Sequence, residues 1–227
     1  MVHKVPIIIT IDGPVSVGKG VISRSLAGRL GWHFLDSGAI YRLLALAVIK
    51  KNISLDDIPH IVNISKSLDI KFIVEPGIDQ KVILSGEDVT NTIRHEECGT
   101  VASKIASIVA VRSALIDYQR SFCKLPGLVA DGRDMGTVVF PEAKLKIFLT
   151  ASAKERAKRR LLQLQDAGIN ANLDTVFVDL VARDKRDSER TVSPLKPDPK
   201  AVIIDTTKLS IDEVLQIVMA HVKNMHF

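Results

Sequence analysis

The sequence predicts an α/β domain with a central, mainly parallel, five-stranded β-sheet and helices on both faces. Five short apolar runs have the character of buried strands, and segments of helical periodicity flank most of them. The runs cover residues 5–12, 32–35, 127–131, 144–149 and 201–205. A chain of 227 residues is long enough for one such domain with a small insertion.

Local signals set the ends of three helices. We expect the first helix to begin near Lys19 and to end at Gly31, because glycine favours the position just after a helix. A second helix starts at "DSGAIYRLLALAVIKK", with Asp36 or Ser37 as its N-cap. The last helix opens at Ser210, which has a glutamate three positions later and so predicts a capping box.

Residues 70–93 interrupt the alternation of strands and helices. Two β-branched runs flank a Pro-Gly pair, which predicts a hairpin outside the main sheet, and helical periodicity returns over 94–122. We therefore expect an inserted subdomain at 60–105, between the core segments 1–59 and 106–227.

Composition favours a small anionic ligand. The formal charge is +5, but aromatic residues make up only 4% of the chain, and none alternate with basic residues as base stacking on nucleic acid requires. The polar N-terminus, the lack of an apolar membrane-length run and two isolated cysteines, Cys98 and Cys123, predict a cytoplasmic protein with reduced thiols. We expect a monomer that binds nucleotides and neither nucleic acid nor membrane.

The segment "IIITIDGPVSVGKG" carries the strongest chemical signal. A strand ends at Asp12, and Gly13 to Lys19 then match G-x-x-x-x-G-K before a helix. In this setting backbone N–H groups and the helix N-terminus cradle phosphates, and Lys19 reaches the outer ones. A glycine-rich turn with no ligand is the alternative. Gly20 stands where this motif usually has Ser or Thr, and Val21 follows it.

Two further motifs place polar groups at the ends of strands. "LDSGAIYR", residues 35–42, joins a helix start to Arg42, and fits either a second anion site or a capped amphipathic helix. "LVADGRDMGTVVFP", residues 128–141, puts Asp131, Arg133 and Asp134 at the carboxyl end of a strand, where open α/β sheets bind ligands.

Two charged segments follow later in the chain. In "VARDKRDSER", a helix would place Arg183, Asp187 and Arg190 on one face, as a ligand site or as a solvated salt-bridged stripe. In "AKERAKRRLLQLQDAG", the arginines fit a basic surface helix or a lid over phosphates, and "INANLDT" after it suits a hinge.

Taken in order, these motifs resemble the bacterial cytidylate kinases within the nucleoside monophosphate kinase family. The matching text is "GPxxxGKG", "LDSGAIYR", "ADGRDMGTVVFP", "KIFLTAS" and "RDxRDxxR", and it extends over essentially the whole chain. The resemblance implies a three-layer P-loop kinase fold, with 60–105 as the NMP-binding insertion and a short lid at 154–172. It implies transfer of the γ-phosphoryl group of ATP to CMP or dCMP.

The resemblance also assigns roles to residues of this chain. The ATP-binding loop comprises Gly13, Pro14, Val15, Ser16, Val17, Gly18, Lys19, Gly20 and Val21. Catalytic roles fall to Lys19, Asp131, Arg133, Arg156, Arg160 and Arg190. The CMP-binding set comprises Ser37, Arg42, Ser103, Arg112, Arg133, Asp134, Arg183, Asp187 and Arg190.

Mg²⁺ is implied as well, held mainly by ATP phosphates and waters, with Asp131 as a candidate ligand of its water shell. Gly at position 20 is normal in these kinases, whereas Val21 departs from their usual Thr. We expect the missing hydroxyl to weaken ATP binding by about 1 kcal/mol.

Hydrogen-bonding chemistry says which groups can select the base: an ionised Asp accepts from the N4 amino group of cytosine, while Arg and Ser donate to N3 and O2. The resemblance implies that Asp134, Arg112 and Ser103 take these roles here and that Ser37 joins them. Uracil would set its O4 against the same carboxylate. Three alternatives stay open from the residues alone: a kinase for a shikimate-like acid, a nucleotide sensor with a decayed loop, and an RNA-binding protein.

Overall fold

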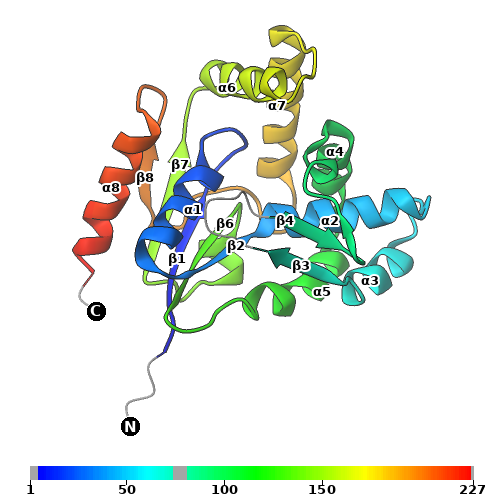
Figure 1. The fold of residues 1–227 in the computed structure, drawn as a ribbon, viewed down its shortest axis with the longest axis horizontal. Helices are drawn as coiled ribbons and strands as arrows, with labels where there is room; N and C mark the ends of the chain where they lie inside the picture. Colours follow the sequence, from blue (N-terminus) through cyan, green and yellow to red (C-terminus); the bar gives the residue numbers. More distant parts are fainter. Residues whose placement is uncertain (1–4, 74–80, 226–227) are drawn as a thin grey trace. The chain divides into compact units, whose positions relative to one another are not determined.

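The computed structural model describes residues 5–73 and 81–225. It divides into two compact units, Met1–Asp36 with Arg120–Phe227, and Ser37–Gln119. Figure 1 shows the elements of both units. The predicted boundary of the insertion, 60–105, stays a prediction.

The first unit contains a five-stranded, fully parallel sheet in the order β2-β6-β1-β7-β8. Its strands are β1 (Ile7–Asp12), β2 (His33–Asp36), β6 (Gly127–Gly132), β7 (Leu145–Thr150) and β8 (Val202–Asp205). The predicted α/β fold with five strands is therefore confirmed, and each strand begins within two residues of its predicted position. Five of the six residues of β1 are buried, which explains the continuous apolar run in the sequence.

Helices and turns of the first unit lie between these strands in the chain, and the last helix follows the final strand. They are α1 (Lys19–Leu30), the π-helical turn η2 (Met135–Val139), α6 (Ala153–Asp166), α7 (Leu173–Glu189) and α8 (Ile211–Lys223). Helices α1 and α8 pack together and share one core with β1 and β7, to which Ile11, Leu26 and Val218 each contribute a fully buried side chain. Helices α6 and α7 pack against each other at the top of Figure 1.

The predicted helix ends are confirmed where a local signal defined them. Gly31 caps α1 in a left-handed conformation (φ 65°), and its N–H donates to the carbonyls of Ala27 and Gly28. Ser210 and Glu213 form the capping box of α8.

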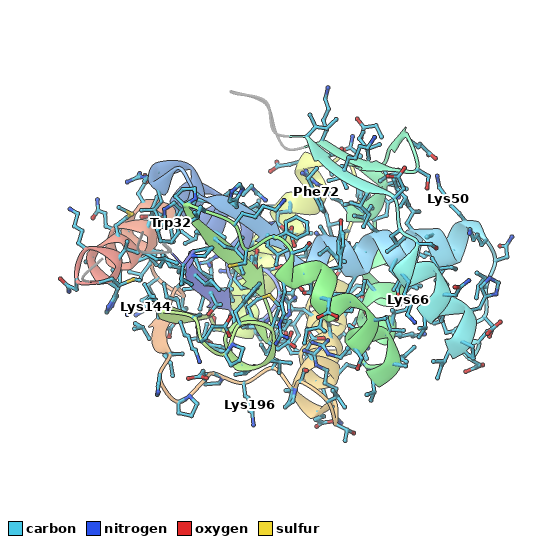
Figure 2. All side chains as sticks on the ribbon, turned by 90° about the horizontal axis from the view of Figure 1, so that it is seen from below. Trp32, Lys50, Lys66, Phe72, Lys144 and Lys196 are labelled. Carbon is cyan, nitrogen blue, oxygen red and sulfur yellow. The ribbon has the colours of Figure 1, made fainter. Side chains whose placement is uncertain are left out.

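The second unit contains helices and a small antiparallel sheet. Its elements are α2 (Ser37–Lys50), α3 (Ile58–Lys66), β3 (Ile70–Ile73), β4 (Lys81–Leu84), β5 (Glu87–Asp88), the 3-10 turn η1 (Thr92–Arg94), α4 (Glu96–Ile105) and α5 (Val109–Arg120). Lys50, labelled in Figure 2, forms an ion pair with Glu87. The sheet has three strands in the order β3-β4-β5 rather than the two of the predicted hairpin, and the Pro-Gly pair lies outside the described residues.

The helical text at 94–122 forms two helices, with a bend of 102° between α4 and α5. No single helix in the described part of the chain has the length and apolarity to cross a membrane, and only this bent pair reaches them jointly. Helix α3 was not predicted, although Asp57 accepts a hydrogen bond from the His60 N–H as its N-cap.

Gly127 offers a test of the packing under the sheet. A Cβ at this position would lie 2.6 Å from the ring of Trp32, which Figure 2 labels, and 2.8 Å from the carbonyl oxygen of Ile7. Gly127→Ala should therefore lower the free energy of unfolding by about 1–3 kcal/mol, measured by urea denaturation. Gly28→Ala is the matched control, because its Cβ would meet nothing within 4 Å, and it should stabilise helix α1 by about 0.5–1 kcal/mol. A destabilised control or a neutral Gly127→Ala would contradict this packing.

Candidate active site

The phosphate-binding loop between β1 and α1 has the backbone shape that its glycines permit. Gly13 adopts φ 150°, and a Cβ there would lie 2.1 Å from the carbonyl oxygen of Leu149 in β7. Ser16 and Gly18 have φ values of 61° and 94°. Lys19 Nζ donates to the Pro14 carbonyl at 2.6 Å, which closes the loop on itself. The sequence motif thus forms a compact cradle at the N-terminus of α1.

Three strands carry an aspartate at or next to their carboxyl ends, near Lys19. Asp12 ends β1, Asp36 ends β2, and Asp131 lies one residue before the end of β6, directly opposite Asp36 in the strand register. Burial lowers the pKa of Lys19, as does the charge of Arg133, while the three carboxylates oppose that effect. Lys19 and Arg133 are therefore electrostatic neighbours at the carboxyl edge of the sheet.

The aspartates respond to burial in the opposite sense. Burial raises the pKa of Asp131, and the charge of Lys19 partly counteracts it. Burial likewise raises the pKa of Asp12 to about 6, although hydrogen bonds from the Gly136 and Met135 amides favour its charged form. Desolvation is the largest effect at each of these sites.

Gly20 allows a carboxylate to approach the loop. An added Cβ at Gly20 would lie 3.4 Å from Asp131 Oδ2. The side chain of Asp131 is 7% exposed. The position where the motif usually carries a hydroxyl residue is therefore next to an acidic oxygen.

A second group of charged side chains surrounds the segment Arg133–Asp134. Arg133 Nε donates to Asp187 Oδ2 at 3.0 Å. Burial opposes the charge of Asp187, yet Arg133, Arg183 and Arg190 together hold the pKa of Asp187 below its usual value. Arg190 NH2 lies 3.9 Å from Asp134 Oδ1, and its Nε donates to the Ser193 carbonyl.

Arg190 departs from the predicted helical stripe. Helix α7 ends at Glu189, so Arg183 and Asp187 lie on it while Arg190 is its C-cap residue with extended backbone (φ −61°, ψ 136°). The guanidinium nevertheless reaches Asp134, because the chain turns back after the helix and Leu195 N–H donates to the Asp187 carbonyl. The alternative of a solvated stripe is wrong for Asp187, which is 4% exposed.

Arg156 links helix α6 to the phosphate-binding loop. Its Nε donates to the Ala151 carbonyl at 2.9 Å and its NH1 to the Val15 carbonyl at 3.3 Å. Its NH2 pairs with Asp184 Oδ2 of α7 at 2.6 Å. Arg160 lies one turn further along α6 and is half-buried. The interpretation of this helix as a purely surface feature is therefore wrong for Arg156, which is 5% exposed.

The second unit holds the other four predicted binding residues. Arg42 NH1 donates to the Ile93 carbonyl at 2.7 Å, and its guanidinium lies over Gly99 of α4. Arg112 NH1 donates to the Ala106 carbonyl at 3.0 Å, and its guanidinium lies 5.5 Å from the ring centre of Tyr41. Ser37 Oγ donates to Gln119 at 2.7 Å, and Ser103 is buried on α4.

Sequence reasoning missed three residues that contact this machinery. Asp12 accepts from the amides that follow Asp134, Asp184 binds Arg156, and Arg120 donates to the Val139 carbonyl. For Asp12, a charged residue closing an otherwise apolar strand was an available signal. Nothing in the local sequence distinguishes Asp184 from the other charges of its helix.

Comparisons with known proteins identify the family of this chain. A family model described as cytidylate kinase matches residues 9–224. A cytidylate kinase of Shewanella loihica is 52% identical over 223 residues, covering 98% of this chain and 96% of that protein. A cytidylate kinase of Azotobacter vinelandii is 49% identical over 218 residues, covering 96% and 95%.

Among solved structures, an uncharacterized protein from Eubacterium ventriosum superposes with a TM-score of 0.50 at 13% identity, over 96% of this chain and 99% of that one. At that identity the likeness concerns the fold alone. The family match and the similarity to curated relatives both extend over nearly the whole chain, and the chain therefore belongs to the cytidylate kinase family.

Proposed function

We propose that the first unit binds ATP on the loop Gly13–Val21 and receives CMP at the Arg133–Asp134 segment. The reaction is transfer of the γ-phosphoryl group of ATP to CMP, which follows from membership of the family. The observation that carries the proposal is the convergence of Lys19, Arg133 and Asp131 at the carboxyl edge of one sheet. Phosphoryl transfer needs alignment and charge neutralisation and no side-chain nucleophile, because a CMP phosphate oxygen attacks.

ATP binding is proposed for the loop amides, Lys19 and Ser16. The Ser16 Oγ is buried and has no hydrogen-bond partner among the described residues, so it is available to donate to a phosphate oxygen. Lys19 would exchange its contact with the Pro14 carbonyl for phosphate oxygens. The negative charge of the nucleotide would then favour the protonated form of this buried lysine.

Mg²⁺ fits the acidic side of this loop. The ion dehydrates reluctantly and is commonly bound by one or two carboxylates together with substrate phosphates. Asp131, whose Oδ2 is next to Gly20, is the residue we propose to hold a water of its shell. When bound, Mg²⁺ would neutralise charge on the ATP phosphates.

CMP recognition is proposed for the charged group around Asp187. Arg133 and Arg190 would bind the CMP phosphate, and Arg183 with Asp187 would face the sugar. Asp134, which is 2% exposed and near Arg190, would accept from the cytosine N4 amino group. Four residues of the second unit keep the CMP-binding role that the family resemblance implies: Ser37, Arg42, Ser103 and Arg112. The same assignment extends to dCMP as a second acceptor.

Arg156 and Arg160 are proposed to stabilise the transferring phosphoryl group. The interaction of a charged donor with the transferring group becomes stronger as negative charge spreads over the equatorial oxygens of that group. Arg156 is already desolvated and fixed to the Val15 carbonyl, which supports a role beside the triphosphate.

Asp134→Asn tests the proposed acceptor. We expect CMP and dCMP to give the fastest ADP release in the native protein, well ahead of UMP and AMP. The amide can donate to the O4 of uracil, so the variant should reduce the CMP over UMP ratio of kcat/KM by at least about tenfold. An unchanged ratio would refute the role of Asp134, and equal rates with all four nucleotides would refute the proposed substrate.

Val21→Thr tests the missing hydroxyl. Val21 is 43% exposed at the start of α1, so the substitution does not disturb the core. A new hydrogen bond to a phosphate is worth about 1 kcal/mol, so KM for ATP should fall about fivefold with KM for CMP unchanged. Val21→Ala is the control, since it removes the branched side chain without adding a hydroxyl. The proposal fails if both variants shift KM for ATP equally.

Asp187→Asn tests the ion pair that holds Arg133. Breaking a buried pair leaves its partner uncompensated, so the variant should lose about 3 kcal/mol of stability at pH 7. Because the pKa of Asp187 is lowered from 3.8 on folding, this advantage of the native protein exists above about pH 4 and disappears as the pH falls through the folded pKa.

Urea denaturation at pH 7, 5 and 3 measures this dependence on pH. The exposed Asp179→Asn on the same helix is the matched control and should change stability by less than about 0.5 kcal/mol. A difference for Asp187→Asn that persisted undiminished at pH 3 would contradict the sign of the effect.

A further inference from the structure

We infer that Asp12 is a positioning residue for pyrimidine recognition, because its carboxylate holds the backbone turn that carries Asp134. This inference rests on the proposed role of Asp134 as the acceptor for cytosine. Asp12 itself is assigned no contact with either nucleotide. It closes β1, immediately before the phosphate-binding loop.

Both oxygens of the Asp12 carboxylate accept hydrogen bonds from the backbone of the same turn. Oδ1 accepts from the Met135 N–H at 2.9 Å, and Oδ2 accepts from the Gly136 N–H at 2.8 Å. These are the first two amides of η2, and Asp134 is the residue just before them. With Asp12 only 6% exposed, water does not readily replace either bond. The position of Asp134 is thus tied to the end of β1.

The other end of η2 is held by a group of opposite charge. Arg120 Nε donates to the Val139 carbonyl at 2.9 Å. An anion at the N-terminal amides and a cation at the C-terminal carbonyls both match the direction of the peptide dipoles. π-helical turns are rare and frequently occur at functional sites. Two charged side chains from other elements therefore hold the two ends of this turn.

Close packing fixes the turn against the sheet. A Cβ at Gly136 would lie 2.8 Å from Thr10 Oγ1 and 3.2 Å from Lys146 Cδ. Gly136 of η2 therefore lies against side chains of β1 and β7. Loss of the Asp12 contacts would move Asp134 relative to its neighbour Arg190.

The charged form of Asp12 is the form this geometry requires. A carboxylate accepts from both amides, whereas an asparagine accepts from one and turns its own NH₂ toward the other. Burial opposes the charge and raises the pKa of Asp12 to about 6, so the two amide bonds and Lys19 help to keep it ionised at pH 7. The alternative role for Asp12 is to neutralise the charge of Lys19. That role predicts a change in KM for ATP.

Steady-state kinetics of Asp12→Asn separate the two roles. We expect the CMP over UMP ratio of kcat/KM to fall about tenfold, with KM for ATP changed less than twofold. A raised KM for ATP with an unchanged ratio would overturn the inference in favour of the Lys19 role. If Asp134→Asn lowers the ratio and Asp12→Asn does not, only this inference fails; if neither lowers it, the proposed function of Asp134 fails.

Arg120→Met gives a second, independent test from an exposed position, in case Asp12→Asn does not fold. It releases the opposite end of the same turn and should lower the CMP over UMP ratio about threefold. Arg29→Met, an exposed arginine of α1, is the matched control and should leave the ratio unchanged. An unchanged ratio in Arg120→Met would count against positioning through η2, as would an equal fall in the control.

Discussion

Burial of opposite charges at the carboxyl edge of the sheet governs the arrangement of the first unit. Lys19, Asp12 and Asp131 are each less than 10% exposed, and each would be costly to bury alone. Parallel strands end at one edge, so Asp12, Asp36 and Asp131 necessarily gather there around the lysine. The phosphate-binding loop and the ionisation of Lys19, Asp12 and Asp131 therefore depend on the same packing.

Arginines proposed to bind phosphate are paired with carboxylates. Arg133 pairs with Asp187, Arg156 pairs with Asp184, and Arg190 lies 3.9 Å from Asp134. Each pair compensates the charge of a guanidinium that is largely removed from solvent. On binding phosphate, each arginine would thus exchange its carboxylate partner or share itself between the carboxylate and the phosphate. This exchange reduces the net binding free energy of each contact, but the carboxylate holds the guanidinium in place in advance.

Sequence reasoning predicted the features that depend on local pattern. The five strands, the glycine-capped α1 and the capping box of α8 each follow from residues close together in the chain. The turn η2 could not be predicted in this way, because its two ends are held by Asp12 and Arg120 from other elements. Asp184 was not predicted for the same reason, because only the tertiary fold brings Arg156 to it. Arg190 shows the limit of helical periodicity as a guide. Helix α7 ends at Glu189, so Arg190 lies in extended backbone just after the helix.

Gly20, at the position where the general phosphate-binding motif usually has Ser or Thr, lies next to a carboxylate of β6. A Cβ at this position would lie 3.4 Å from Asp131 Oδ2 and 3.5 Å from Arg24 NH1, which are ordinary van der Waals distances. Glycine therefore leaves an acidic oxygen, and no hydroxyl, at this point of the loop. A carboxylate can accept from metal-bound water just as a hydroxyl oxygen can, so in the proposed Mg²⁺ site Asp131 would take the part of the hydroxyl that position 20 lacks.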